Sequence, residues 1–178
     1  RLRSAVAKAV TWQILDAHPF AAVKPLKTDR GGRVRYLTTD EEKSLRKALV
    51  DRETKLREAR DRFNAWREKR HLKPLPARTG AYLDHLRPMV LLALNTGLRR
   101  GELLSLEWSG VNLEGKMLTV QGDTAKTGQT RRVPLNAEAL ETLVTWRELV
   151  PHAAEDFVFP GAEGERLGRV DKAWETAL

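Results

Sequence analysis

Apolar residues recur at helical spacing at the start of the chain. Leu2, Val6, Val10 and Ile14 follow one another every four residues, and alanines widen the stripe. This pattern predicts an amphipathic helix over residues 1–15. Such a broad apolar face needs a surface to pack on, so we expect this helix to be the last one of a preceding domain.

A second, longer helix is expected to begin at a capping box. Thr38 with Glu41, or the equivalent pair one residue later, has the Ser/Thr-x-x-Glu spacing of that motif. The helix is expected to run to about Arg70, because prolines follow at positions 74 and 76. The opposite face is rich in charge and is expected to be exposed and salt-bridged. The apolar stripe of this helix consists of Leu45, Leu49, Leu56, Phe63 and Trp66.

The segment between these helices, residues 16–37, breaks the periodicity with two prolines and two glycines. Between Lys24 and Tyr36 its only acidic residue is Asp29. We interpret it as an interdomain linker that clamps a DNA backbone, although a merely solvated linker has the same composition. The basic residues concerned are Lys24, Lys27, Arg30, Arg33 and Arg35.

A continuous apolar run at residues 89–94 predicts a central helix. The helical pattern spans residues 82–95, and Pro88 requires the helix either to begin late or to kink. Gly97 suits its C-terminal cap, and a short helix over residues 99–106 follows almost at once.

The periodicity then changes from helix to strand. Three short strands are expected, at residues 111–113, 117–121 and 131–135. The later elements are a helix at 137–149, a short buried stretch at 157–160 and a last helical start at 170–178. The pattern as a whole predicts an α+β fold that is mainly helical, with a small three-stranded antiparallel sheet.

Composition narrows the class of protein. The chain has 178 residues, 41% of them hydrophobic, with a net charge of +8 and a pI of about 10. This excess of positive charge favours a polyanionic partner such as a nucleic acid. Charge alone is equally compatible with a basic protein that has no nucleic-acid role. No apolar run approaches the roughly 20 residues of a membrane helix. With no cysteine and four scattered histidines, none paired at metal-ligand spacing, we expect no metal site.

The first candidate for chemistry is the turn between the central helix and the short helix. Thr96 and Gly97 close one helix, and Arg99 opens the next, where its guanidinium could grip a phosphate. Glu102 lies three residues on and could orient Arg99. Taken alone, these residues fit a helix corner with a surface Arg–Glu pair better.

The second candidate is Lys126 in the loop between the second and third strands. A lysine on a hairpin can deliver a proton or a point charge, although a solvated lysine in a polar turn is the simpler interpretation. A P-loop is excluded because Ala125, not glycine, precedes the lysine. The Lys-Thr-Gly triplet also occurs in penicillin-binding enzymes, but Ser44 of a Ser-x-x-Lys match lies inside the long charged helix.

Taken together, these segments resemble the tyrosine recombinases, or phage integrases. The run LLALNTGLRRGELLSLEW at residues 91–108 resembles the family's first conserved box, and AKTGQTRRVPL at 125–135 resembles its catalytic hairpin. Leu37-Thr38 with Glu41-Glu42 resembles the start of the catalytic domain. Phe159-Pro160 and Lys172-Ala173-Trp174 resemble the approach to the second box.

The resemblance implies cleavage and rejoining of DNA through a 3′-phosphotyrosyl intermediate, without ATP, metal or any other cofactor. It implies that Arg99 binds non-bridging phosphate oxygens, that Lys126 protonates the leaving 5′-oxygen and that Glu102 supports Arg99. Further expected DNA contacts are Arg100, Thr127, Arg131 and Arg132, beside the five basic linker residues. The expected partner is double-stranded DNA, bound by a tetramer of the full-length protein in the cytoplasm of a bacterial or phage-infected cell, associated with the nucleoid.

The chain also departs from the family pattern. It has no His-x-x-Arg pair, and its tyrosines, Tyr36 and Tyr82, both precede Arg99. It begins without Met and stops inside a helical segment, so we expect a longer protein whose 178-residue part is monomeric and inactive alone. The stretch 52–81 is longer than expected between the first two catalytic-domain helices.

The expected organisation follows from these segments. Residues 1–20 would end a core-binding domain, 21–37 would form the linker and 38–178 would begin the catalytic domain. Two alternatives remain open at this point. One is a basic helical module that grips DNA without chemistry, and the other is an RNA-binding protein, for which no recognition motif is present.

Overall fold

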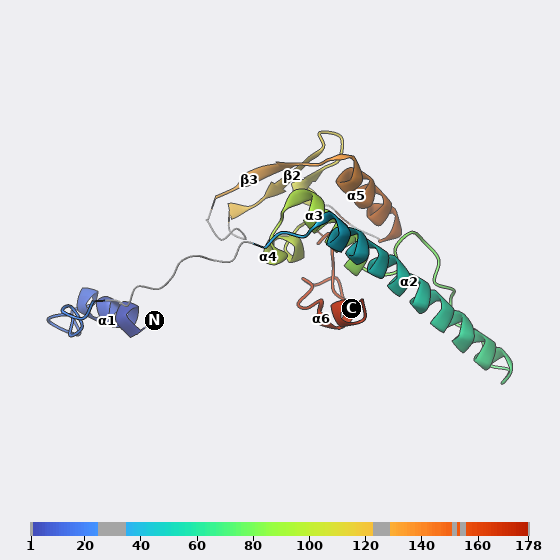
Figure 1. Ribbon diagram of the computed structural model, residues 1–178, viewed down its shortest axis with the longest axis horizontal. Helices are drawn as coiled ribbons and strands as arrows, with labels where there is room; N and C mark the ends of the chain where they lie inside the picture. The colour runs from blue at the N-terminus through green and yellow to red at the C-terminus, as the bar shows by residue number, and fades with distance from the viewer. Residues whose placement is uncertain (1, 25–34, 123–128, 151–152, 154–155, 178) are drawn as a thin grey trace. The chain divides into compact units, whose positions relative to one another are not determined.

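A computed structural model of the chain describes residues 2–24, 35–122, 129–150, 153 and 156–177. The chain divides into two compact units, Arg1–Tyr36 and Leu37–Leu178. The first unit contains helix α1 (Leu2–Thr11), and the second contains the other helices and the sheet (Figure 1). The assignment of residues 1–20 to a core-binding domain, of 21–37 to a linker and of 38–178 to a catalytic domain stays a prediction.

Helix α1 is shorter than the periodicity predicts. It ends at Thr11, and Gln13 turns the chain with a positive φ of 58°. Arg3 then ties the returning chain down, because its Nη2 donates to the carbonyl of Phe20 at 2.7 Å. No residue of α1 is buried. In the apolar stripe, Leu2 is 69% exposed, while Val6 and Val10 are partly buried.

Helix α2 (Thr39–Glu68) begins at the predicted capping box. The Glu41 amide donates to Thr38 Oγ1 at 3.2 Å, and the Thr38 amide donates to Glu41 Oε2 at 2.9 Å. Only the first half of the helix enters the core, at Leu49. The predicted apolar stripe continues beyond this half, but its outer residues are not buried, since Phe63 and Trp66 are each 44% exposed.

Helix α3 (Leu86–Thr96) is the central helix and packs against α5 (Ala137–Leu149). It begins late rather than kinking, which places Pro88 in the first turn, where a backbone N–H has no helical partner. Leu92 of α3 and Leu143 of α5 are fully buried at the heart of the main core. Among the described residues, no helix combines the length and apolar character needed to cross a bilayer.

The sheet consists of β1 (Val111–Asn112), β2 (Met117–Val120) and β3 (Arg131–Pro134). It is antiparallel in the order β1-β2-β3, and Val120 of β2 pairs with Arg131 of β3. Leu118 and Val120 are buried on the face turned to the core. All three strands lie within one residue of the predicted bounds, and the mainly helical α+β fold is confirmed.

The C-terminal part of the chain closes the core. Val158 and Phe159 are buried, and the Trp146 indole N–H donates to the Val158 carbonyl at 2.6 Å. This confirms the short buried stretch. The last helix, α6 (Asp171–Glu175), is followed by Ala177, which joins Leu49 in a second, smaller apolar cluster.

Candidate active site

The turn that carries Arg99 is fixed from both sides. Gly97 adopts the left-handed conformation, with φ 65° and ψ 19°, and its amide donates to the Ala93 carbonyl at 2.9 Å. Glycine takes this conformation without the strain a Cβ would bring. Leu98 is 6% exposed and anchors the turn in the main core. The predicted glycine cap is therefore confirmed, and it delivers Arg99 to the surface in an extended conformation.

Helix α4 (Arg100–Leu104) follows, with Arg99 as its N-cap residue. It has five residues, so it is shorter than the predicted helix over 99–106. The amide of Arg99 donates to Glu102 Oε2 at 2.8 Å and is not free for a ligand. We therefore attribute any phosphate affinity here to the guanidinium group and not to a helix terminus.

Glu102 is the centre of the site. Its side chain is 1% exposed and accepts four hydrogen bonds from two arginines. Arg131 holds both carboxylate oxygens, at 2.8 and 2.7 Å, while Arg99 Nη1 donates to Oε1 at 3.1 Å. The hydrogen bonds from Arg131, followed by those from Arg99, lower the pKa of Glu102 to about 2 despite its burial. The carboxylate therefore stays charged and holds both guanidinium groups in fixed positions.

The side chain of Arg99 is 55% exposed. Among the described residues, its guanidinium contacts Glu102 alone, through one of its terminal nitrogens. The other nitrogens of its planar guanidinium group, here called the Arg99 fork, are available for a bidentate contact with a phosphate. The prediction that Glu102 orients Arg99 agrees with this geometry, and its supporting role in catalysis stays a prediction.

Arg131 has a different place from the one expected of a DNA contact. It is the first residue of β3 and faces the core side beside Val120, where Glu102 accepts from both of its terminal nitrogens. Sequence reasoning missed this pairing. The signal was an arginine at the start of the third predicted strand, but nothing local linked it to an acid 29 residues away.

The hairpin lysine lies outside the described residues, as does Thr127. What the structure describes is the base of the loop, residues 121–122 and 129–130, where the Gly122 amide donates to Thr130 Oγ1 at 3.1 Å. Because Arg131 joins this base to Glu102, the strand ends that bracket residues 123–128 lie beside the Arg99 turn.

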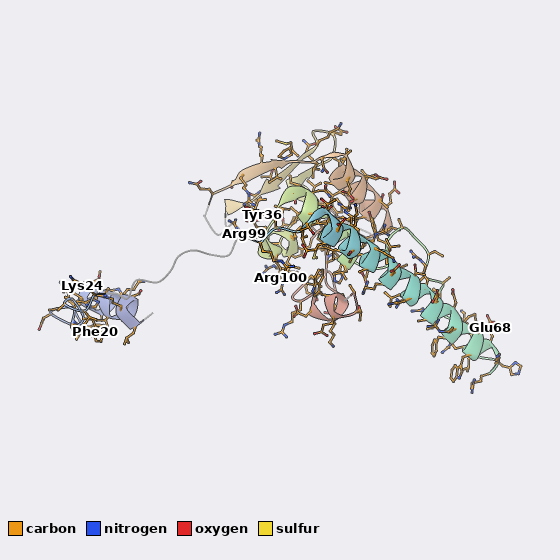
Figure 2. All side chains as sticks on the ribbon, viewed as in Figure 1. Phe20, Lys24, Tyr36, Glu68, Arg99 and Arg100 are labelled. Atoms are coloured by element: carbon orange, nitrogen blue, oxygen red, sulfur yellow. The ribbon has the colours of Figure 1, made fainter. Side chains whose placement is uncertain are left out.

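The other predicted DNA contacts are dispersed. Arg132 is exposed and points to the opposite face of the sheet from Arg131. Arg100, labelled in Figure 2, is exposed. Its Nη2 lies 3.7 Å from Asp171 Oδ1. Lys24 and Arg35 are exposed residues of the first unit. Lys27, Arg30 and Arg33 lie outside the described residues.

A second polar network braces the end of α3 behind the turn. Glu138 of α5 accepts from Arg46 of α2 and, at 2.8 Å, from Asn95 Nδ2 of α3. Its pKa is lowered, mainly by the hydrogen bond from Arg46. The Asn136 side chain donates to Asn95 Oδ1 at 2.6 Å. This network ties three helices together one residue before the Thr96-Gly97 turn, and the sequence pattern gave no sign of it.

No group of three or more metal-binding side chains occurs among the described residues. A hollow of about 280 Å³ borders Glu102, and the described residues that line it include Glu107 but no lysine or arginine. It does not suit a phosphate. The exposed Arg99 fork is the part of this site that does.

The comparisons with known proteins assign the class. The family model described as "Phage integrase family" matches residues 37–177, and the chain belongs to this family. Tyrosine recombinase XerC of Xanthomonas campestris pv. campestris (strain B100) is 37% identical over 86 residues, which cover 47% of this chain and 26% of the relative. The integrase of Shigella phage Sf6 is 30% identical over 71 residues, 40% of this chain and 18% of that protein.

Solved structures show the same fold. The Tn1549 transposon integrase in complex with a circular intermediate DNA matches with a TM-score of 0.58 at 18% identity, covering 96% of this chain and 52% of that one. A lambda integrase tetramer bound to a Holliday junction matches with a TM-score of 0.56 at 22% identity, covering 99% and 44%. The matched part thus spans about a quarter of the curated relative XerC and about half of these solved chains.

Proposed function

We propose that the chain is part of a site-specific DNA recombinase that cleaves and rejoins DNA strands through a 3′-phosphotyrosyl intermediate. The observation that carries this proposal is the Arg99 fork, held by a buried Glu102 that the catalytic hairpin also grips through Arg131. Membership in the phage integrase family supports the same reaction.

In this proposal Arg99 binds the non-bridging oxygens of the scissile phosphate. Negative charge on these oxygens grows as the nucleophile attacks, and a fixed guanidinium stabilises it without reorganising. Glu102 keeps the fork in place because its pKa, about 2, leaves it ionised at neutral pH. Arg131 is a positioning residue in this scheme, since its terminal nitrogens are engaged by Glu102.

The first chemical step forms a bond from a tyrosine oxygen to phosphorus and breaks the bond from phosphorus to the 5′-oxygen. Lys126 donates the proton that this leaving oxygen needs. In the second step a free 5′-hydroxyl attacks the phosphotyrosyl phosphorus and releases the tyrosine. Each step exchanges one phosphodiester for another, so no ATP is consumed.

The tyrosine nucleophile is not supplied by either tyrosine of this chain. Tyr82 is partly buried and packs edge-on against Trp146, with 6.4 Å between ring centroids. Tyr36 belongs to the first unit and precedes the Arg99 turn by 63 positions. We propose that residues 1–178 alone form no covalent adduct with DNA, and detection of a phosphotyrosyl adduct on them would contradict this.

The proposed partner is double-stranded DNA carrying recombination sites. It is supported by the neighbours whose titles name DNA complexes, among them the lambda integrase tetramer on a Holliday junction. We propose a tetramer on DNA for the whole recombinase and a monomer for these 178 residues. A location on the nucleoid follows from the same proposal.

The experiment that tests the proposed function is strand exchange between two duplex sites by the recombinase that contains this chain. Arg99→Ala should abolish exchange, and Arg99→Lys should restore little of it, because a lysine lacks the bidentate fork. Near-normal exchange by Arg99→Ala would show that this residue is not the phosphate ligand. If the wild-type protein binds DNA but never exchanges strands, the result would instead support the alternative, a DNA-binding module without chemistry.

The role of Lys126 has its own test. Lys126→Ala should slow cleavage of an ordinary duplex by about 100-fold or more, in line with the usual contribution of general acid catalysis. A duplex whose scissile 5′-oxygen is replaced by sulfur has a leaving group that needs no proton. The variant should cleave that substrate at nearly the wild-type rate, and an equal loss on both substrates would contradict the role.

A further inference from the structure

The positive charge of the chain is concentrated in one segment. Residues 54–80, here called the arm, contain nine lysines and arginines and three acidic residues. The other 151 residues contain 23 basic and 21 acidic residues and are close to neutral. The arm therefore carries six of the eight net positive charges, and it lies within the 52–81 stretch that the sequence pattern left without a role.

The arm is built from the second half of α2 and the chain that returns along it. Beyond Glu53, no residue of α2 is buried, and Figure 1 shows this half of the helix extending away from the sheet. Glu68 marks its far end in Figure 2. The 15 residues that follow Glu53, up to Glu68, correspond to a reach of about 22 Å at the rise of an α-helix.

A ladder of side-chain hydrogen bonds holds the returning chain to the helix. Asn64 makes two of them with the backbone of Leu75, donating at 2.9 Å and accepting at 2.8 Å. Three arginines of α2 donate to backbone carbonyls of residues 73–80, at 2.7 to 3.1 Å: Arg57, Arg60 and Arg67. A carbonyl fixes a guanidinium group but leaves its full charge in place, so the arm is ordered and still basic.

The tip of the arm adds two stacked guanidinium groups. Phe63 and Trp66 stack with 5.6 Å between ring centroids and an interplanar angle of 8°. The guanidinium carbon of Arg70 lies 4.1 Å from the Trp66 ring centroid, and that of Arg67 lies 5.7 Å from the Phe63 centroid. Both ring systems thus have an arginine over them, which holds those groups against the helix.

Acidic neighbours neutralise little of this charge. Within the described residues 54–80, the ion pair is Arg62 with Glu58, exposed and 3.6 Å long. Lys69 and Lys73 are exposed at the turn after α2, beside Arg70. The charged face of this half of α2 is exposed as predicted, but the Arg62–Glu58 pair leaves most of its positive charge uncompensated.

We propose that the arm is an auxiliary binding site for the phosphate backbone of duplex DNA, distinct from the Arg99 site. The choice of DNA rests on the proposed function. A reach of about 22 Å corresponds to about six base pairs at 3.4 Å each, so the arm would lengthen the footprint by about half a helical turn. Its contribution to affinity is electrostatic and independent of base sequence.

Two other polyanions fit the arm less well. A single strand binds through bases that stack on open aromatic faces, but Arg67 and Arg70 already lie over Phe63 and Trp66. An acidic protein surface would be expected to meet a hydrophobic centre ringed by polar residues. The arm instead distributes its charges along its length, which matches the regular spacing of backbone phosphates.

The test compares two triple variants of the whole chain that lose the same charge. The arm variant is Lys69→Gln with Arg70→Gln and Lys73→Gln. The matched control is Lys43→Gln with Lys47→Gln and Lys116→Gln, all exposed residues outside the arm. Affinity for a 30-base-pair duplex is measured by fluorescence anisotropy from 50 to 300 mM salt.

The arm variant should bind at least about tenfold more weakly at 100 mM salt, and its log–log salt slope should fall by about 2 to 3. The control should lose less than about threefold. Equal losses in both variants, or no measurable duplex binding by the wild-type chain, would overturn the proposal. So would an arm-dependent preference for single-stranded RNA or for polyglutamate over the duplex.

A second measurement does not depend on removing charge. The chain has no cysteine, so Lys69→Cys and Lys47→Cys each provide a single attachment point for a photo-crosslinker. Crosslinking to the duplex should be several-fold stronger from position 69, and equal yields would contradict the proposal. Neither measurement involves strand exchange, so a failed arm and a failed Arg99 role are separate results.

Discussion

The Arg99 site and the arm are both rich in arginine, but they fix their guanidinium groups in opposite ways. At the site, Arg99 and Arg131 share the buried carboxylate of Glu102. In the arm, Arg57 and Arg60 donate to backbone carbonyls instead. A carboxylate cancels one unit of charge and makes the geometry depend on its ionisation. A carbonyl does neither. The Arg99 site is therefore sensitive to acid, while the arm keeps its positive charge at any pH in the ordinary range.

Glu102→Ala should cause the largest loss of stability. The substitution leaves Arg99 and Arg131 without their common partner and opens a void in the packed turn, at a cost of about 3 kcal/mol in the free energy of unfolding. Urea denaturation of the chain measures this. A loss below about 0.5 kcal/mol would mean that the shared carboxylate does not hold the site together.

Acid should weaken the site in a defined range of pH. The folded-state pKa of Glu102, about 2, lies below its ordinary value of 4.5. Its contribution is therefore complete above pH 4.5 and is lost as the pH falls towards 2. Over this range of pH the free energy of unfolding of the wild type should fall by about 2 kcal/mol more than that of Glu102→Gln. This figure allows for the solvent exposure of both arginines. Parallel curves for the two proteins, from urea denaturation at each pH, would contradict the prediction.

Neighbouring arginines on β3 provide a matched pair. Arg131→Ala should raise the pKa of Glu102 from about 2 towards its ordinary 4.5, because the hydrogen bonds from Arg131 are the main cause of the lowered value. Arg132→Ala should leave that pKa unchanged, since Arg132 lies on the other face of the strand. Carboxyl-carbon NMR across a pH titration gives both values, and an equal change in the two variants would refute the arrangement.

The arm should respond to a change that leaves its charge intact. Asn64→Ala removes both hydrogen bonds to Leu75. It should lower the free energy of local opening by about 1 kcal/mol, and only within the arm. Amide hydrogen exchange should speed up at residues 72–80 and stay unchanged in α3. Faster exchange in α3 as well would contradict this prediction, because it would show that the arm is coupled to the core.

The sequence predicted the features that depend on neighbouring residues. The Thr38–Glu41 capping box, the Gly97 cap and the three strands each follow from a few adjacent side chains and were found as expected. A capping box or a glycine cap needs no information from the rest of the chain.

The features that depend on distant partners were not predicted. Periodicity predicted the apolar face of α2. It did not predict that this face stays partly exposed at Phe63 and Trp66. The grip of Arg131 on Glu102 spans 29 positions, and that of Arg46 on Glu138 spans 92. Which acid an arginine meets is decided by the packing of whole elements, and one sequence holds no direct record of that packing.

The central claim is that Arg99, held by Glu102, binds the scissile phosphate. The most direct measurement is the rate of covalent adduct formation on a nicked duplex at saturating DNA, by the proposed recombinase. Arg99→Ala should slow the adduct by at least about 100-fold, the usual cost of removing a fixed donor to a developing oxyanion. Arg100→Ala removes an adjacent arginine of similar exposure. Its predicted DNA contact bears on binding and not on the transition state, so at saturating DNA this rate should stay within about threefold. Equal effects of the two substitutions would contradict the account.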